Sequence, residues 1–217
     1  MADVEHSLAT YVSDMLAVEE HVCVPFKTQR DDKDFTSSPL AGPLVSRITA
    51  LSETHIQTLQ SALDSLGGHP AHAAKSALTN IEGWVASAID KMRKTKVAKG
   101  LRDDYTAMAL CTAGYAMLLT TANAFGNTSV AQLAKRHLED YAQALMEISN
   151  VLPAVVVEDL KQMGMPVDES MIAASQEEIQ DAWRTGEGAH TRTTTTTGTI
   201  ETEATVNRTQ NPTYPTI

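Results

Sequence analysis

The stretch that most constrains the fold is residues 101–126, LRDDYTAMALCTAGYAMLLTTANAFG. Residues of its core side recur at alternating steps of four and three, the spacing of one stripe along an α-helix. The stripe comprises Leu101, Tyr105, Met108, Thr112, Tyr115, Leu119 and Ala122. Asp103 and Asp104 suit the positive end of a helix dipole, and Gly126-Asn127 is typical of a C-cap. Because the other positions are mostly small and apolar, we expect this inner helix to be buried on nearly every side.

Three further segments carry a similar apolar stripe, and with residues 101–126 they predict an all-α protein built on an antiparallel four-helix bundle. These segments are residues 6–29, 42–66 and 128–151, the last of which we expect to end at Pro153. Between them, residues 30–41 predict a polar loop and residues 72–96 a crossing helix packed on the bundle. Extra C-terminal helices are expected over residues 154–163 and 168–184.

The chain therefore divides into three predicted parts: a helical bundle over residues 1–152, accessory helices over 153–184, and an extended tail over 185–217. The tail is rich in Thr, which favours strands over helices, and it has no helical period. One interpretation is a disordered tail. The other is an extended arm that lies on a neighbouring subunit or on a partner protein.

The charge balance limits the partners and the compartment. A formal net charge of -10 argues against nonspecific nucleic-acid binding and against anionic membrane surfaces. The sequence has no run of 18 apolar residues and no classical signal peptide, so we expect a cytoplasmic protein without a membrane span. Cys23 and Cys111 are expected as free buried thiols of a reducing compartment, with a disulfide between the two helices as the alternative.

Three polar residues interrupt the apolar stripes, each near the middle of its helix: Glu19, His55 and His137. In an antiparallel bundle the middle positions share one layer, and we expect Tyr115 and Tyr141 close to the same layer. Such a cluster can bind one divalent metal. It can equally form a Glu–His–Tyr hydrogen-bond network without metal.

Sequence signatures of other enzyme classes are absent from the chain. There is no Gly-rich phosphate loop, no nucleophile elbow, no Cys-x-x-Cys pair and no Cys/His zinc pattern. No predicted helix carries a Glu-x-x-His pair in its stripe, so the usual ligand spacing of a metal site is missing as well.

The order of the helices and several short motifs resemble the ferritin-like superfamily, and within it the bacterial stress-induced ferritin-like family of poorly known function. The similarity covers about residues 7–152. It is carried by DMLAVEEHV in the first helix, THIQTLQSALDSLGG in the second, Tyr115 with the A-x-x-F-G ending of the inner helix, and RHLEDYAQAL in the last. The resemblance implies a four-helix bundle, often dimeric, with a di-metal carboxylate site.

The ligands implied by that resemblance are only partly present. The first helix keeps an acid at Glu19 or Glu20, the second keeps His55, and the last keeps an acid at Glu139 or Asp140. The inner helix should bring Glu and His, but it has Met108, Ala109 and Cys111 there. We therefore expect a degenerate site that holds no metal or one iron, manganese or zinc ion, and no di-iron ferroxidase centre.

The function predicted from these features is that of a non-enzymatic ferritin-like structural or assembly protein, a homo-oligomer that self-associates through its C-terminal arm. The alternative is a stress-response protein that binds a divalent metal, iron or manganese, with Glu19, His55 and His137. A third hypothesis makes the tail a short motif that a partner protein reads.

Overall fold

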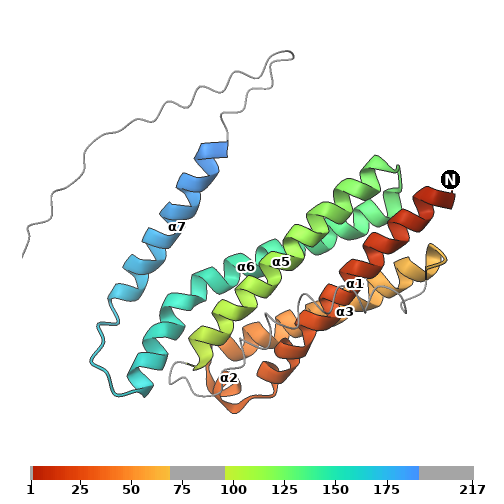
Figure 1. Cartoon of the computed structure of the whole chain (residues 1–217). Helices are drawn as coiled ribbons and strands as arrows, with labels where there is room; N and C mark the ends of the chain where they lie inside the picture. The colour runs from red at the N-terminus through yellow and green to blue at the C-terminus, as the bar shows by residue number, and fades with distance from the viewer. Residues whose placement is uncertain (1, 69–95, 191–217) are drawn as a thin grey trace, which may run out of the picture. The chain divides into compact units, whose positions relative to one another are not determined.

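A computed structural model describes residues 2–68 and 96–190, which form six α-helices (Figure 1). The helices are α1 (Ala2–Arg30), α2 (Lys33–Ser37), α3 (Ala41–Ser65), α5 (Lys96–Ala124), α6 (Thr128–Gln162) and α7 (Met171–His190). The all-α class is confirmed for this part of the chain. The predicted crossing helix over residues 72–96 and the tail beyond residue 190 lie outside the described residues, apart from Lys96, which begins α5.

Four long helices pack side by side around one apolar core (Figure 1). Helix α1 runs antiparallel to α3, because Glu19 contacts His55 while Ala9 lies beside Gly68. It also runs antiparallel to α5, because Glu19 contacts Tyr115 while Gln29 lies beside Gly100. Two pairs of contacts in the same way make α6 antiparallel to α3 and to α5. It follows that α3 and α5 are parallel, and that the end of α3 and the start of α5 lie at opposite ends of the bundle.

Glycines set the close approach and the turn of α5. A Cβ atom placed on Gly114 would lie 2.7 Å from Sδ of Met15, so the missing side chain lets α1 and α5 pack closely. Gly126 has φ 71°, the left-handed conformation that ends a helix, as its C-cap pattern predicted. The following helix α6 is capped by Asn127, whose side chain accepts a hydrogen bond from the N–H of Val130.

The predicted end of the last bundle helix at Pro153 is wrong, since α6 continues through this proline to Gln162. A proline inside a helix costs about 3 kcal/mol or more. Beyond it, however, Val155 and Asp159 are buried, and their packing keeps the helix intact. The segment 154–163 is therefore the C-terminal end of α6 with its C-cap Met163, and no separate helix.

Three other boundaries differ from the predictions. Helix α5 begins at Lys96, so Asp103 and Asp104 lie in its third turn and not at its start. The expected loop over residues 30–41 contains the short helix α2, capped by Asp32, which places Phe35 in the core. Helix α7 continues to His190, although the Thr-rich composition predicted that the helical part ends near residue 184.

The expectation that the inner helix is buried on nearly every side is also wrong. The side chains of Leu110 and Met117 on α5 are 43% and 59% exposed. Helix α5 lies at the edge of the bundle like the other three, and its low charge does not reflect burial of all its faces.

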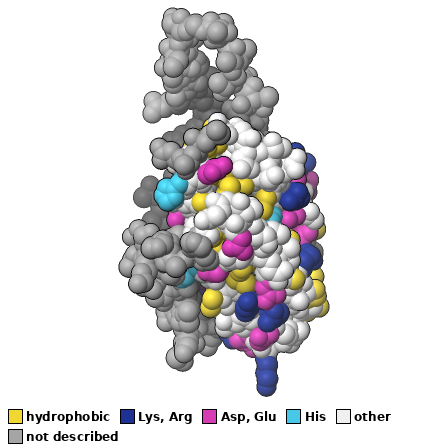
Figure 2. Space-filling model, turned by 90° about the vertical axis from the view of Figure 1, so that its right-hand side faces the viewer, with side chains coloured by type: hydrophobic (Ala, Val, Ile, Leu, Met, Phe, Trp, Pro, Cys, Tyr) yellow, Lys and Arg dark blue, Asp and Glu magenta, His cyan; other side chains and the backbone are white. Residues whose placement is uncertain are grey.

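The chain divides into two compact units, Met1–Ile179 and Gln180–Ile217. In the first unit Cys23 and Cys111 are free buried thiols, as expected, and no disulfide joins them. None of the helices in residues 2–68 and 96–190 is long and apolar enough to span a membrane. On the face of the molecule in Figure 2, acidic, basic and hydrophobic side chains are interspersed, without a continuous basic patch on that face.

Candidate functional site

The candidate site is centred on Glu19, whose side chain is completely buried in the middle of the bundle. Its Oε1 accepts a hydrogen bond of 2.5 Å from the hydroxyl of Tyr115, and its Oε2 accepts one of 2.6 Å from Tyr141. Ser52 donates to Oε2 at 3.0 Å, and Nδ1 of His55 lies 3.1 Å from Oε1. All four helices of the bundle therefore contribute to this one carboxylate.

The hydrogen bonds use each oxygen of Glu19 twice. A carboxylate has about four acceptor positions, and here all four are taken by protein groups. The two tyrosine hydrogen bonds are as short as charge-assisted O–H···O⁻ bonds. A buried carboxylate satisfied in this way is held in one geometry, because any movement would leave a buried donor unpaired.

His55 connects Glu19 to a second acid at the edge of the cluster. Its Nε2 lies 3.2 Å from Oδ2 of Asp140, whose side chain is 45% exposed. An ionised carboxylate can only accept hydrogen bonds, so a ring between two such groups must donate from both nitrogens. A ring that donates from both nitrogens is an imidazolium. His55 thus links the buried Glu19 to the half-exposed Asp140.

His137 stacks on His55 with ring centroids 3.8 Å apart and nearly parallel planes. Burial and the nearby charges of His55 and Arg136 lower the pKa of His137 to about 3, so this ring is neutral at neutral pH. Its Nε2 lies 2.9 Å from the hydroxyl of Thr58, while its buried Nδ1 has no hydrogen-bond partner. His137 is thus the one member of the cluster with an unused polar atom.

The remaining groups of the layer are poor nucleophiles. Burial and the charge of Glu19 raise the pKa of both Tyr115 and Tyr141, so their hydroxyls stay protonated and keep donating. The same two causes raise the pKa of the buried Cys111 thiol, which disfavours the reactive thiolate. The chemistry that this layer can perform without an added group is hydrogen bonding.

The predicted convergence of Glu19, His55 and His137 with both tyrosines is confirmed. The resemblance also suggested Glu20, Glu139 and Asp140 as acids of the site, and of these only Asp140 contacts the cluster. Glu20 is exposed on α1. Glu139 is exposed on α6, where it pairs with Lys135 at 3.6 Å. Both point away because residues adjacent on a helix diverge by about 100°.

No group of three or more His, Cys, Asp or Glu side chains in the described part of the chain is placed to hold a metal ion. The sequence prediction also missed the two hydroxyl donors Ser52 and Thr58. Each is three positions from His55 on α3, one on either side. Their spacing along the helix was the signal that could have found them.

A second buried carboxylate, Asp104 on α5, was also missed. Its side chain is only 2% exposed, and its Oδ2 has no hydrogen-bond partner. Burial raises its pKa to about 8, while a hydrogen bond from Gln29 acts in the opposite direction. Asp104 is therefore mostly protonated at neutral pH. Its spacing of four and seven residues from Met108 and Cys111 on the buried stripe could have revealed it.

A third buried acid, Asp159 of α6, supports the start of α5. Its Oδ2 accepts a hydrogen bond of 3.0 Å from the backbone N–H of Ala98, one of the N–H groups that lack a partner within a helix. Burial raises the pKa of Asp159, and the hydrogen bond from Ala98 lowers it. We interpret Asp159 as a capping residue because its contact is to the backbone.

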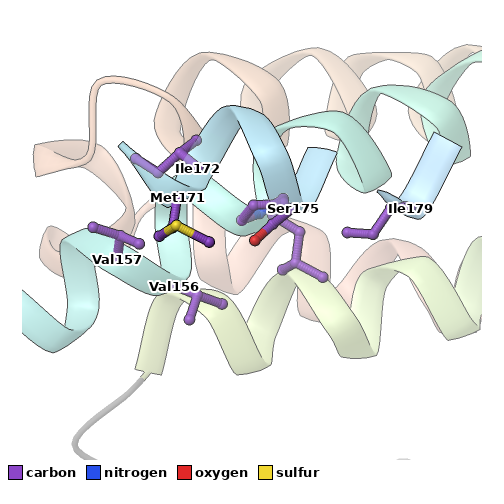
Figure 3. A pocket seen from close by; sticks show the side chains of 8 residues that line it. Val156, Val157, Met171, Ile172, Ser175 and Ile179 are labelled. Carbon is purple, nitrogen blue, oxygen red and sulfur yellow. The ribbon is translucent and has the colours of Figure 1, made fainter. Parts of the chain in front are cut away.

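An apolar groove of about 260 Å³ lies between the end of α6 and the first turns of α7 (Figure 3). Val156 and Val157 come from α6, and Met171, Ile172 and Ile179 come from α7. Ser175 is the only polar side chain in the lining. A small-molecule site usually has several converging polar groups, so we do not place the functional site here.

Comparisons with known proteins bear on the fold alone. No family model matches the chain, and no curated protein matches it. A protein from Xanthomonas campestris pv. campestris, known from its crystal structure, has a similar structure with a TM-score of 0.60. The two sequences are 18% identical, and the match covers 75% of this chain and 99% of the other. The likeness shows a common helical fold.

Proposed function

We propose that this protein is a ferritin-like helical bundle with a degenerate metal site, and that its role is structural or assembly-related instead of enzymatic. The observation that carries the proposal is the saturation of Glu19 by four protein donors. The proposal keeps the function expected from the sequence and gives it a physical basis in the bundle core.

The topology supports the ferritin-like assignment. Ferritin-like bundles have one long crossover connection, because their two middle helices are parallel. Helices α3 and α5 are parallel as well, and residues 66–95 lie between them. This arrangement differs from a simple up-down-up-down bundle, in which successive helices are antiparallel and joined by short loops.

The site residues support the loss of the metal centre. In ferritin-like di-metal proteins two helices each supply a Glu, and each of the other two supplies a Glu-x-x-His pair. Helix α3 has Ser52 and His55 at this spacing, so a hydroxyl stands where a carboxylate is expected. Helix α5 supplies Tyr115 to the layer, and α6 supplies Tyr141. These hydroxyls occupy the lone pairs of Glu19 that a metal would need, and the residues present do not fit a di-metal centre.

Metal content tests this proposal. The purified protein is analysed by elemental mass spectrometry before and after incubation with Fe²⁺, Mn²⁺ and Zn²⁺, next to the Glu19→Gln variant. We expect less than stoichiometric metal in both proteins. One or more metal ions per chain that are lost in Glu19→Gln would contradict the proposal.

The assembly role is proposed for the C-terminal arm beyond α7, residues 191–217, on the basis of its Thr-rich sequence. Because α7 ends at His190, a chain that stops after this residue keeps every described helix. We expect this truncated chain to keep its helix content and to lose assembly beyond a small oligomer in multi-angle light scattering. An unchanged mass would refute the role of the arm.

A divalent-metal-binding stress-response protein remains the second candidate, and one observation favours it. His137 is neutral and its Nδ1 has no hydrogen-bond partner, so this nitrogen is the group of the cluster most available to a metal. In this case His137→Gln, like Glu19→Gln, should abolish any stoichiometric metal. Retention of metal in both variants would place it elsewhere in the chain.

A further inference from the structure

The outward face of α5 carries no charge over most of its length. From Tyr105 to Ala134 the sequence contains no Asp, Glu, Lys, Arg or His, although the chain as a whole carries a formal charge of -10. Burial explains this composition only on the core side. The other side of α5 is solvent-exposed and still lacks charged residues, which is unusual for a solvated helix face.

The exposed positions on this face form a second stripe, which we call the outer α5 stripe. It comprises Thr106, Leu110, Ala113, Met117, Thr120 and Ala124, all of them exposed. The steps between them are four, three, four, three and four, the heptad spacing of a helix that packs against another helix. Leu110 and Met117 are the two large apolar members, and between them lies the small Ala113.

The stripe is nearly the same when it is read in either direction. Leu110 lies three positions before Ala113 and Met117 four positions after it, while Thr106 and Thr120 lie seven positions on either side. A two-fold axis close to Ala113 would therefore bring the two large side chains of one helix near those of the other. A patch that is its own complement is what an isologous dimer interface requires.

We infer that the outer α5 stripe is the interface of a homodimer, in which α5 packs antiparallel against α5 of a second copy. Leu110 then contacts the partner's Met117, and Ala113 contacts the partner's Ala113. Small residues beside the stripe, Ala109 and Ala116, allow the two helices to approach within the usual 8–10 Å. The segment from Thr106 to Thr120 would give a contact about 21 Å long, at 1.5 Å per residue.

The charge distribution favours a second copy over another partner. Two molecules that each carry -10 repel one another wherever acidic faces meet, and this repulsion is smallest at a face without charges. The outer α5 stripe shares no residue with the Glu19 cluster or with the C-terminal arm. The inference therefore goes beyond the proposed function and does not depend on it.

Charge pairs across the proposed axis test the inference in the full-length chain. Leu110→Glu and Met117→Lys each bury a lone charge at the interface and should weaken self-association roughly a hundredfold or more. The double variant Leu110→Glu/Met117→Lys places opposite charges face to face and should restore the dimer. Sedimentation equilibrium over a range of protein concentrations measures the dissociation constant of each, and circular dichroism checks that the helix content is unchanged.

Met146→Glu is the matched control, because Met146 is 44% exposed on α6, close to the 43% of Leu110. We expect it to leave the dissociation constant unchanged. A monomeric wild-type protein would overturn the inference, as would single variants that associate like the wild type. Loss of the dimer without rescue in the double variant would overturn the antiparallel pairing. Loss of thermal stability without a change in mass would show instead that another segment of the same chain covers the stripe.

The C-terminal truncation distinguishes this interface from the arm. A chain that ends at His190 keeps the outer α5 stripe, so it should remain a dimer even if larger assemblies dissolve. If this truncation alone produces monomers, the arm and not α5 holds the two copies together, and the inference fails.

Discussion

Two of the three buried carboxylates, Glu19 and Asp104, have opposite hydrogen-bonding environments. Glu19 has four hydrogen-bond donors from α1's three neighbours, and one of them is a histidine that can carry positive charge. Asp104 is almost equally buried on α5, but one of its oxygens has no partner, and its pKa is raised to about 8. The first site satisfies every acceptor position of its acid, whereas the second avoids the charge by keeping its proton.

The difference shows that burial alone does not make a polar site functional. A buried acid with a complete set of donors forms a rigid part of the core, because each donor would be left unpaired without it. A buried acid without such a set lowers the stability of the folded state at neutral pH, since the unfolded chain can ionise it freely. Each site therefore predicts a different response to substitution.

Truncation of Glu19 should have the largest effect. Glu19→Ala leaves the hydroxyls of Tyr115 and Tyr141 and the ring of His55 unpaired in the core, which we expect to cost about 3–5 kcal/mol of unfolding free energy. Urea denaturation followed by circular dichroism measures this loss. Glu20→Ala is the control, since Glu20 is exposed, and should change stability by less than about 0.5 kcal/mol. Equal effects of the two substitutions would refute the network.

Asp104 should make stability fall as the pH rises. Its pKa is 3.8 in the unfolded chain and about 8 in the folded one. Between these two values the folded state holds a proton that the unfolded state has lost. Each pH unit therefore lowers the free energy of unfolding by about 1.4 kcal/mol. Relative to the wild type, Asp104→Asn should gain about 3 kcal/mol between pH 5 and pH 7. A constant difference between the two proteins over this range would show that Asp104 does not titrate as described.

His137 should act in the opposite pH direction and with a smaller effect. Its folded-state pKa of about 3 lies below the 6.5 of the unfolded chain, so acid favours unfolding as the pH falls from 6.5 toward 3. We expect His137→Gln to reduce the loss of stability between pH 6 and pH 4 by about 2 kcal/mol. Thermal unfolding at a series of pH values measures this decrease of stability. The same decrease in His137→Gln as in the wild type would contradict a neutral, stacked His137 ring.

Periodicity predicted the bundle and its central layer because both depend on which residues face the core. Glu19, His55 and His137 stand out in a sequence because each replaces an apolar residue at a core position. Their convergence then follows from antiparallel packing, in which mid-helix positions meet. The sequence could not decide between a metal and a hydrogen-bond network, because that choice depends on hydroxyl groups such as Ser52, which are common on solvated faces too.

The errors arose where tertiary packing overrides a local signal. Pro153 is a strong helix breaker, but the buried residues that follow it hold α6 together. Asp103 and Asp104 are typical of a helix start, although α5 begins at Lys96 and Asp104 faces the core. The absence of charge on α5 predicts burial, whereas Leu110 and Met117 are exposed. In each case the residue type indicated a preference, and its neighbours in space decided the outcome.

The central claim is that the side chain of Glu19 is fully satisfied by its protein donors while that of Asp104 is not. Glu19→Gln and Asp104→Asn change a carboxylate to an amide of the same shape, and their unfolding free energies at pH 7 are compared by urea denaturation. We expect opposite signs, a loss of roughly 1–3 kcal/mol for Glu19→Gln and a gain of roughly 2–4 kcal/mol for Asp104→Asn. A change of the same sign in both variants would contradict the account.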